Sequence, residues 1–177
     1  MRLSLARKII VEGIKKNVAQ TLKKPITFHL EGSMGIGKTA LARQIAEDLG
    51  FYLVIVSLPQ LEPTDVGGMR MPQGDKMIVL QPDWYVDAEQ MAKLKAEGYK
   101  GVLYFFDELP QSPVLNMNIF AQIADEYRIG DYVLDRSDCY VMSAGNKLSN
   151  KAGTNAMPTH LIDRLTFLEI EPNLDDT

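Results

Sequence analysis

The sequence has almost none of the residues that build disulfides or metal sites with nitrogen and sulfur ligands. Its 177 residues include one cysteine and two histidines, which are Cys139, His29 and His160. A single cysteine excludes an internal disulfide framework and a cysteine-rich zinc site, and the histidines lack the spacing of a metal-binding pair. If a metal takes part in the function, oxygen atoms must hold it.

Long hydrophobic runs are also missing. A membrane-spanning helix needs about 20 mostly apolar residues, whereas the longest apolar stretch near the N-terminus, residues 9–11, is flanked by charged side chains. The same charges argue against a signal peptide. With 46% hydrophobic and 24% charged residues, the chain has the composition of one globular domain. We therefore expect a cytoplasmic protein without a membrane partner.

Positive charge is concentrated at one end of the chain. Residues 1–24 contain seven Lys or Arg and one Glu, and the rest of the chain contains 12 basic and 22 acidic residues. Apolar residues recur there at helical spacing, namely Leu5, Ile9 or Ile10, Ile14 and Val18. This pattern predicts a basic amphipathic helix over 1–24, followed by the main domain over 25–177. Its lysines are interpreted as a solvated face, with contact to nucleic acid as the alternative.

Beyond residue 24, apolar strands alternate with helices. We expect strands at 26–30, 51–56, 102–106, 139–144 and 166–170. Helices are expected at 38–49, 87–97, 113–126 and 159–164, and hairpins at 69–80 and 128–134. Continuous apolar strands joined by helices predict a three-layer α/β fold, in which a five-stranded parallel sheet is covered on both faces. Ligands of such sheets bind at the carboxyl ends of the strands.

A glycine-rich loop follows the first expected strand. The motif G-x-x-x-x-G-K-[ST] is matched by Gly32, Ser33, Met34, Gly35, Ile36, Gly37, Lys38 and Thr39. Between a strand and a helix, such a loop directs backbone N–H groups at phosphate oxygens. Lys38 would reach the β and γ phosphates, and the Thr39 hydroxyl would bind Mg²⁺. The loop therefore predicts a nucleotide site, the alternative being a glycine turn beside an exposed lysine.

Two adjacent carboxylates end the third expected strand. Asp107 is expected to hold Mg²⁺ directly or through water, and Glu108 to polarise an attacking water. An Asp-Glu pair can also be a simple turn, but its position 69 residues after Lys38 favours these roles.

An asparagine follows the fourth expected strand. Asn146 should reach the same edge of the sheet and orient the lytic water, unless it only ends the strand. Ser149 stands where a guanine-binding N-K-x-D motif has its aspartate. ATP is therefore expected rather than GTP.

Taken in order, these motifs resemble an AAA+ ATPase, and more closely the MoxR-like group of the helix-2-insert clade, within the dynein-related AAA subfamily. The resemblance covers roughly residues 25–175. Besides the phosphate loop, it rests on residues 61–68, 107–113, 127–134, 143–146 and 157–164. It implies a sensor role for Asn146 and makes Arg164 an arginine finger for a neighbouring subunit. The alternative for Arg164 is an ion pair with Asp163 or a loop carboxylate of its own chain.

This resemblance also implies a function and partners. MoxR-like proteins are chaperone-type protein-remodelling ATPases that assemble into rings, commonly hexamers, and serve protein substrates or partners with von Willebrand factor A domains. Residues 69–80 would be the helix-2 insert and 127–134 the hairpin before the sensor strand. The helical lid of such modules is expected to be absent, since the sequence ends at Thr177. Two alternatives remain, a nucleotide-gated interaction module with little hydrolysis and a DNA-directed motor.

For several other residues, a structural role is the preferred interpretation. Cys139 and His29 are expected in the core. Arg136 is interpreted as a surface residue, with a second arginine acting on a neighbouring subunit as the alternative. The methionines of residues 69–80 either pack the hairpin or form an adaptable contact surface.

Overall fold

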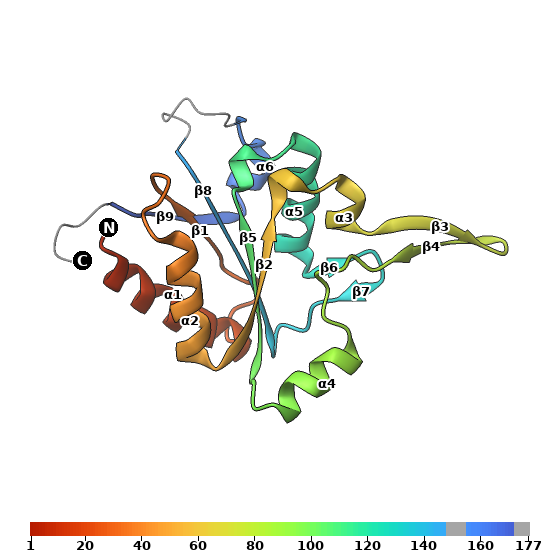
Figure 1. Cartoon of the computed structure of the whole chain (residues 1–177), viewed down its shortest axis with the longest axis horizontal. Helices are drawn as coiled ribbons and strands as arrows, with labels where there is room; N and C mark the ends of the chain where they lie inside the picture. Colours follow the sequence, from red (N-terminus) through yellow and green to blue (C-terminus); the bar gives the residue numbers. More distant parts are fainter. Residues whose placement is uncertain (148–154, 172–177) are drawn as a thin grey trace.

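The computed structural model describes residues 1–147 and 155–171 (Figure 1). Ser149 and the last six residues, which bear on the guanine motif and the lid, lie outside the described residues. In chain order the helices, strands and short 3₁₀ helices (η) are α1 (Leu3–Val18), β1 (Thr27–Glu31), α2 (Lys38–Leu49), β2 (Phe51–Ser57), η1 (Leu58–Gln60), α3 (Pro63–Gly67), β3 (Met69–Gln73), β4 (Lys76–Leu80), α4 (Ala88–Ala96), β5 (Gly101–Asp107), η2 (Leu109–Gln111), α5 (Val114–Glu126), β6 (Arg128–Ile129), β7 (Tyr132–Val133), β8 (Cys139–Gly145), α6 (Thr159–Ile162) and β9 (Leu165–Glu169).

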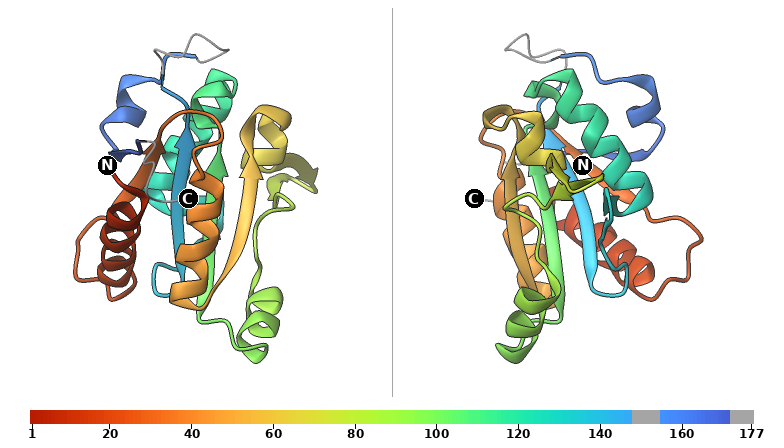
Figure 2. Two further views of the ribbon diagram at one scale, coloured as in Figure 1. Left: turned by 60° about the vertical axis from the view of Figure 1, so that its left-hand side comes forward. Right: turned by 90° about the vertical axis from the view of Figure 1, so that its right-hand side faces the viewer.

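Five parallel strands form the central sheet in the order β2-β5-β8-β1-β9. Helices α1 and α2 cover one face, and α5 and α6 cover the other (Figure 2). The predicted three-layer fold with a five-stranded parallel sheet is thereby confirmed. Strands β5 and β8 lie inside the sheet, so their side chains are almost entirely buried, as the continuous apolar runs indicate.

Helix α1 packs on the sheet beside α2, and its buried face is only partly the one predicted. Ile10 and Ile14 are fully buried as expected, whereas Leu5 is 51% exposed and Ile9 is 36% exposed. A Cβ added at Gly13 would lie 2.6 Å from the Phe28 ring. The close contact at this glycine turns Gly13, rather than the Leu5 and Ile9 side, toward the sheet. The helix ends at Val18, six residues before the predicted boundary.

The segment after α1 is held by Arg136. Its guanidinium donates to the carbonyl oxygens of Lys23 at 3.2 Å and Leu22 at 3.0 Å, and to Asn17 Oδ1 at 3.1 Å. An arginine committed in this way to its own chain is not available to a neighbouring subunit. The contacts of Arg136 within its own chain favour a structural role over the alternative of a second arginine that acts on a neighbouring subunit.

Two antiparallel hairpins leave the sheet, as predicted. Strands β3 and β4 form a long hairpin that projects from the body, and β6 and β7 form a short one near its base (Figure 1). The Tyr132 hydroxyl of the short hairpin donates to the Val79 carbonyl of the long one at 2.7 Å. No helix within the described residues is long and apolar enough to cross a membrane.

Candidate nucleotide-binding site

The glycine-rich loop connects the end of β1 to the start of α2. Gly35 and Gly37 have φ angles of 75° and 96°, in the left-handed region that favours glycine. At Gly32 an added Cβ would lie 3.0 Å from the Ile170 carbonyl oxygen. The loop can therefore wrap closely around the N-terminus of α2, where backbone N–H groups and the helix dipole attract anions.

Lys38 is the first residue of α2, and its side chain turns back into the loop. Its Nζ donates to the carbonyl oxygens of Gly32 at 2.8 Å and Ser33 at 2.9 Å, and to Asn146 Oδ1 at 3.2 Å. Burial lowers the pKa of Lys38, while Asp107 and Glu108 act in the opposite direction. These bonds fix the lysine beside the end of β8, which carries Asn146.

Thr39 and Asp107 bring two oxygen ligands together from different elements. Thr39 Oγ1 donates to Asp107 Oδ2 at 2.8 Å, and Asp107 Oδ1 accepts the Glu108 N–H at 2.9 Å. A hydroxyl and a carboxylate beside a phosphate loop are the oxygen ligands that Mg²⁺ prefers. The residues present therefore fit a magnesium ion.

Glu108 has an unusual backbone conformation. Its φ angle is 58°, a left-handed conformation that costs a residue with a side chain about 1–3 kcal/mol. It lines one cavity of about 260 Å³ together with Met34, Gly35, Gly37, Lys38, Thr39, Ala40, Asp107, Gly145 and Asn146. The cavity thus brings together residues from the phosphate loop, β5 and β8. Three other residues of the loop support the cavity without lining it. The carbonyl oxygens of Gly32 and Ser33 accept hydrogen bonds from Lys38, and Ile36 packs against the core.

Comparison with known proteins agrees with this geometry. Residues 28–110 match the family model described as "ATPase family associated with various cellular activities (AAA)". The fold is that of an AAA+ P-loop NTPase core. No curated protein matches the sequence at a significant level.

Two solved structures illustrate the fold. One is a protein from Cytophaga hutchinsonii assigned as an ATPase, with a TM-score of 0.55, 18% identity and 96% of this chain covered. The other is the closed state of Hsp104 with ATPγS and FITC casein, with a TM-score of 0.61, 17% identity and 94% of this chain covered. This chain spans 46% and 33% of the lengths of those two chains, which is less than half of each. The likeness concerns the fold.

Arg164 lies away from the candidate nucleotide cavity of its own chain. It immediately precedes Leu165, which pairs with Thr27 at the start of β1, whereas the phosphate loop follows the last residue of β1, Glu31. The two ends of this five-residue strand lie about 13 Å apart. Arg164 Nε lies 3.3 Å from Asp125 Oδ2, and its guanidinium also donates to the His160 carbonyl. The carboxylate partner is thus on α5, which the sequence did not indicate.

The sequence also missed a buried polar pair next to the candidate nucleotide-binding site. His29 Nδ1 lies 2.9 Å from Ser143 Oγ, and both residues are fully buried in neighbouring strands. Burial, helped by the positive charge of Lys38, lowers the pKa of His29 to about 3. His29 is therefore neutral near pH 7. Its expected place in the core is confirmed, but its partner lies 114 residues away and has no local signal.

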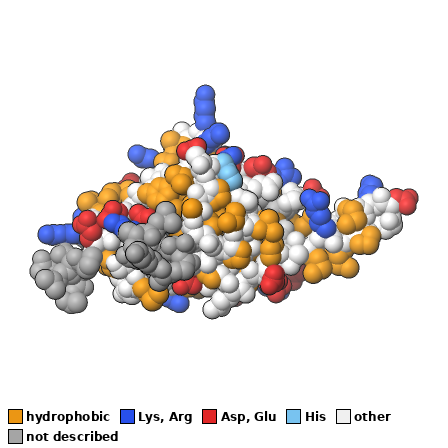
Figure 3. Space-filling view, turned by 90° about the horizontal axis from the view of Figure 1, so that it is seen from above, with side chains coloured by type: hydrophobic (Ala, Val, Ile, Leu, Met, Phe, Trp, Pro, Cys, Tyr) orange, Lys and Arg blue, Asp and Glu red, His pale blue; other side chains and the backbone are white. Residues whose placement is uncertain are grey.

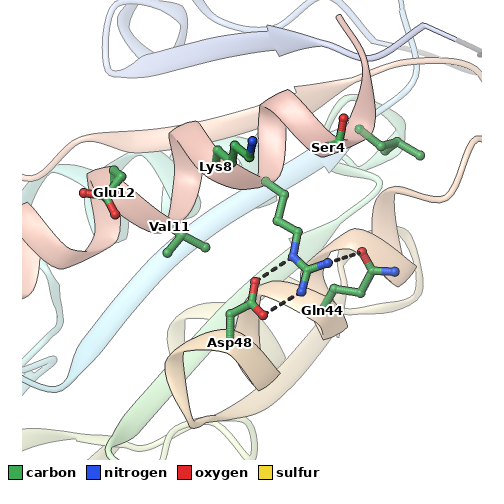
Figure 4. A pocket seen from close by; sticks show the side chains of 8 residues that line it. Ser4, Lys8, Val11, Glu12, Gln44 and Asp48 are labelled. Carbon is green, nitrogen blue, oxygen red and sulfur yellow. Dashed lines mark hydrogen bonds and ion pairs between the residues drawn. The ribbon is translucent and has the colours of Figure 1, made fainter. Parts of the chain in front are cut away.

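A larger cavity of about 700 Å³ lies between α1 and α2 (Figure 4). Arg7 donates to both carboxylate oxygens of Asp48 at 2.6 Å and to Gln44 Oε1 at 3.5 Å. These bonds join α1 to α2 and commit the Arg7 guanidinium to its own chain. The smaller cavity is the functional candidate because polar groups from three elements converge on it.

Proposed function

We propose that this chain binds MgATP and hydrolyses it, as the AAA+ core of a MoxR-like ATPase that remodels proteins as an oligomer. One observation carries the ATPase proposal: Lys38, the Thr39–Asp107 pair, Glu108 and Asn146 line a single cavity. Each group has a separate task in the transfer of a phosphoryl group to water. The match of residues 28–110 to an ATPase family supports the same activity.

The site residues divide the reaction between them. The loop N–H groups and Lys38 would bind the β and γ phosphates, and Thr39 and Asp107 would hold Mg²⁺. When bound, Mg²⁺ neutralises phosphate charge. Glu108 would polarise the attacking water and accept its proton. The Asn146 amide would orient that water, since it lies beside Lys38 at the carboxyl edge of the sheet.

The proposed oligomer is a ring of identical subunits, a hexamer by resemblance to MoxR-like proteins. The position of Arg164 supports this proposal, because it lies at the opposite end of β1 from the phosphate loop and would serve a nucleotide site other than that of its own subunit. We place the protein in the cytoplasm, where ATP is available. A helical lid would be supplied outside the residues described.

The β3–β4 hairpin supports a protein substrate. One face of this hairpin carries the directly paired residues Met69, Leu80, Met71 and Ile78. Met69, Met71 and Leu80 are 49%, 41% and 42% exposed, and hydrophobic side chains are visible along the projection (Figure 3). Flexible methionines adapt to varied apolar partners. The Hsp104 structure, which contains ATPγS and casein, supports nucleotide-dependent handling of a protein. A protein with a von Willebrand factor A domain is the candidate partner by resemblance.

Lysine substitution in the phosphate loop tests the ATPase proposal. Lys38→Ala should weaken MgATP binding by at least about 100-fold, because the loop N–H groups alone cannot balance the phosphate charge. The measurements are nucleotide titration and the ATPase rate at increasing protein concentration. Lys93→Ala, which removes an exposed lysine of α4, is the matched control.

A rate per chain that rises steeply with concentration is expected, because sites completed by a neighbour need assembly. Binding by Lys38→Ala within threefold of the wild type would remove the phosphate-loop assignment. A wild-type chain that binds MgATP but does not hydrolyse it at any concentration would favour the nucleotide-gated module instead.

A further inference from the structure

The short helix η2 follows Glu108 and packs against the end of β8. An added Cβ at Gly145 would lie 2.1 Å from Pro110 Cδ and 2.6 Å from Pro110 Cγ. Only glycine therefore allows the proline ring to approach β8 this closely. The contact brings the turn after Glu108 next to the strand end that carries Asn146.

Gln111, the last residue of η2, bridges these two parts of the site. Oriented by its hydrogen-bonding partners, its side-chain amide donates from Nε2 to the Glu108 carbonyl at 3.2 Å. Its Oε1 accepts the Asn146 backbone N–H at 3.2 Å. The Gln111 backbone N–H donates to the same Glu108 carbonyl at 3.0 Å. The Gln111 side chain thus joins the proposed general base, Glu108, to the proposed sensor, Asn146. Asn146 lies 35 residues after Gln111 in the sequence.

A second asparagine attaches to the same turn. The Asn155 backbone N–H donates to the Pro110 carbonyl at 2.7 Å, and its Nδ2 donates to the Ser112 carbonyl at 2.9 Å. Residues before and after the 147–154 segment are therefore both bonded to the 110–112 turn. Asn146, the first residue after β8, is thereby held in a fixed position relative to Glu108.

We propose that Gln111 is a positioning residue for ATP hydrolysis, which fixes the Asn146 segment relative to Glu108 without touching the nucleotide. The proposal rests on the proposed ATPase function. Glu108 and Asn146 must act on one water molecule at the same time, and a misplacement of about 1 Å can cost on the order of 100-fold in rate. Glu108 also needs support from its neighbours, because its left-handed backbone persists only where surrounding contacts enforce it.

The geometry separates the expected effect on rate from the effect on binding. Lys38 and Thr39, which would bind phosphate and Mg²⁺, have no hydrogen bond to Gln111 among the described residues. Removing the Gln111 amide should therefore lower kcat and leave nucleotide affinity nearly unchanged. A residue with only a structural role would instead lower stability, binding and rate together.

Gln111→Met tests this, since methionine has a similar length but neither amide group. We expect kcat for ATP to fall by about 10- to 100-fold, with KM and the Kd for MgATP within twofold of the wild type. Gln122→Met, at an exposed position of α5, is the matched control and should keep the wild-type rate. Gln111→Ala removes the same amide groups and introduces a smaller side chain. It is used for the same measurements if the methionine variant does not fold.

Amide hydrogen exchange gives a readout that needs no turnover. The Asn146 N–H should exchange faster in Gln111→Met than in the wild type or in Gln122→Met, because its acceptor has been removed. A kcat within twofold of the wild type, unchanged exchange at Asn146, or parallel losses of kcat and MgATP affinity would overturn the proposal. Absence of ATPase activity in the wild type would refute the proposed function, and the exchange measurement would still decide whether the bridge exists.

Discussion

Glu108 combines two properties at the scale of a single residue, a carboxylate facing the cavity and a left-handed backbone. Backbone strain of this kind clusters at functional sites, where the surrounding structure compensates for it. The conformation directs the chain from β5 into η2, so Pro110 and Gln111 meet β8. Asp107, one residue earlier, remains in the strand and faces Thr39. The two adjacent carboxylates are thereby suited to the different tasks proposed for them.

This division predicts different results for two substitutions. Glu108→Gln should retain MgATP binding and lose hydrolysis by about 10²- to 10⁴-fold, because an amide cannot accept the proton of the attacking water. Asp107→Asn should in addition weaken the dependence of binding on Mg²⁺. Nucleotide titration and steady-state ATPase rates measure both effects. Glu97→Gln, an exposed position after α4, is the control. Normal turnover by Glu108→Gln would assign the general base elsewhere.

The residues that sequence reasoning identified share a local signal. Lys38, Thr39, Asp107 and Glu108 stand in short motifs at strand ends, and the structure places all four along one cavity. The residues that sequence reasoning missed are instead defined by contacts between distant parts of the chain. Ser143 meets His29 across 114 residues, and Gln111 meets Asn146 through a proline–glycine contact. Ordinary serine and glutamine residues carry no sign of such partners in the sequence.

At the scale of elements, the bounds of the five sheet strands and of the helices expected after residue 24 could be predicted to within one or two residues. Apolar strand runs and the glycine at the end of α2 mark these bounds directly. The buried face of α1 was harder to predict from the sequence, because it includes Gly13 and Asn17, which a search for apolar residues does not detect. A small residue that allows close packing does not stand out in a hydrophobicity pattern.

The β3–β4 hairpin gives a prediction at the same scale. The protein-substrate role proposed for the hairpin can be tested with FITC-labelled casein as a test protein. If the hairpin binds the substrate as proposed, the double substitution Met69→Ser and Met71→Ser should weaken casein binding in the presence of ATPγS by about tenfold or more, because it removes two exposed apolar side chains of one face. MgATP affinity should not change, since neither residue lines the nucleotide cavity. Fluorescence anisotropy measures casein binding. Leu115→Ser, which removes an apolar side chain that is 56% exposed on α5, is the control. Equal casein binding by the double variant and the wild type would contradict this role of the hairpin.

At the scale of the whole molecule, the sheet separates the phosphate loop from Arg164. The loop follows the carboxyl end of β1, and Arg164 precedes the strand that pairs with its amino end. Within one subunit, the arginine pairs with Asp125 near the surface, at side-chain exposures of 35% and 32%. A pair this exposed contributes only about 0–1 kcal/mol to stability. Such a weak pair leaves the guanidinium available to a neighbouring subunit.

A mixing experiment tests whether Arg164 acts on a neighbour. Subunits with Lys38→Ala have no working site but an intact arginine, and subunits with Arg164→Ala have a working site but no arginine. Each variant should be nearly inactive alone, because an arginine finger contributes about 10³- to 10⁵-fold to the rate. Mixed assemblies place an intact arginine beside an intact site at some interfaces, so hydrolysis should partly return. Arg43→Ala, an exposed arginine of α2, should remain active alone.

A substitution at Asp125 separates this role from a local one. If Arg164 served only to pair with α5, Asp125→Asn would reduce the ATPase rate as much as Arg164→Ala does. If the guanidinium acts on the next subunit, Asp125→Asn should retain most of the activity, since it removes only the exposed ion pair. The guanidinium offers planar, paired donors to charge that develops on the transferred phosphoryl group, which no group on α5 requires. Full activity of Arg164→Ala alone, or no recovery at any mixing ratio despite co-assembly shown by an independent tag, would rule out the assignment in trans.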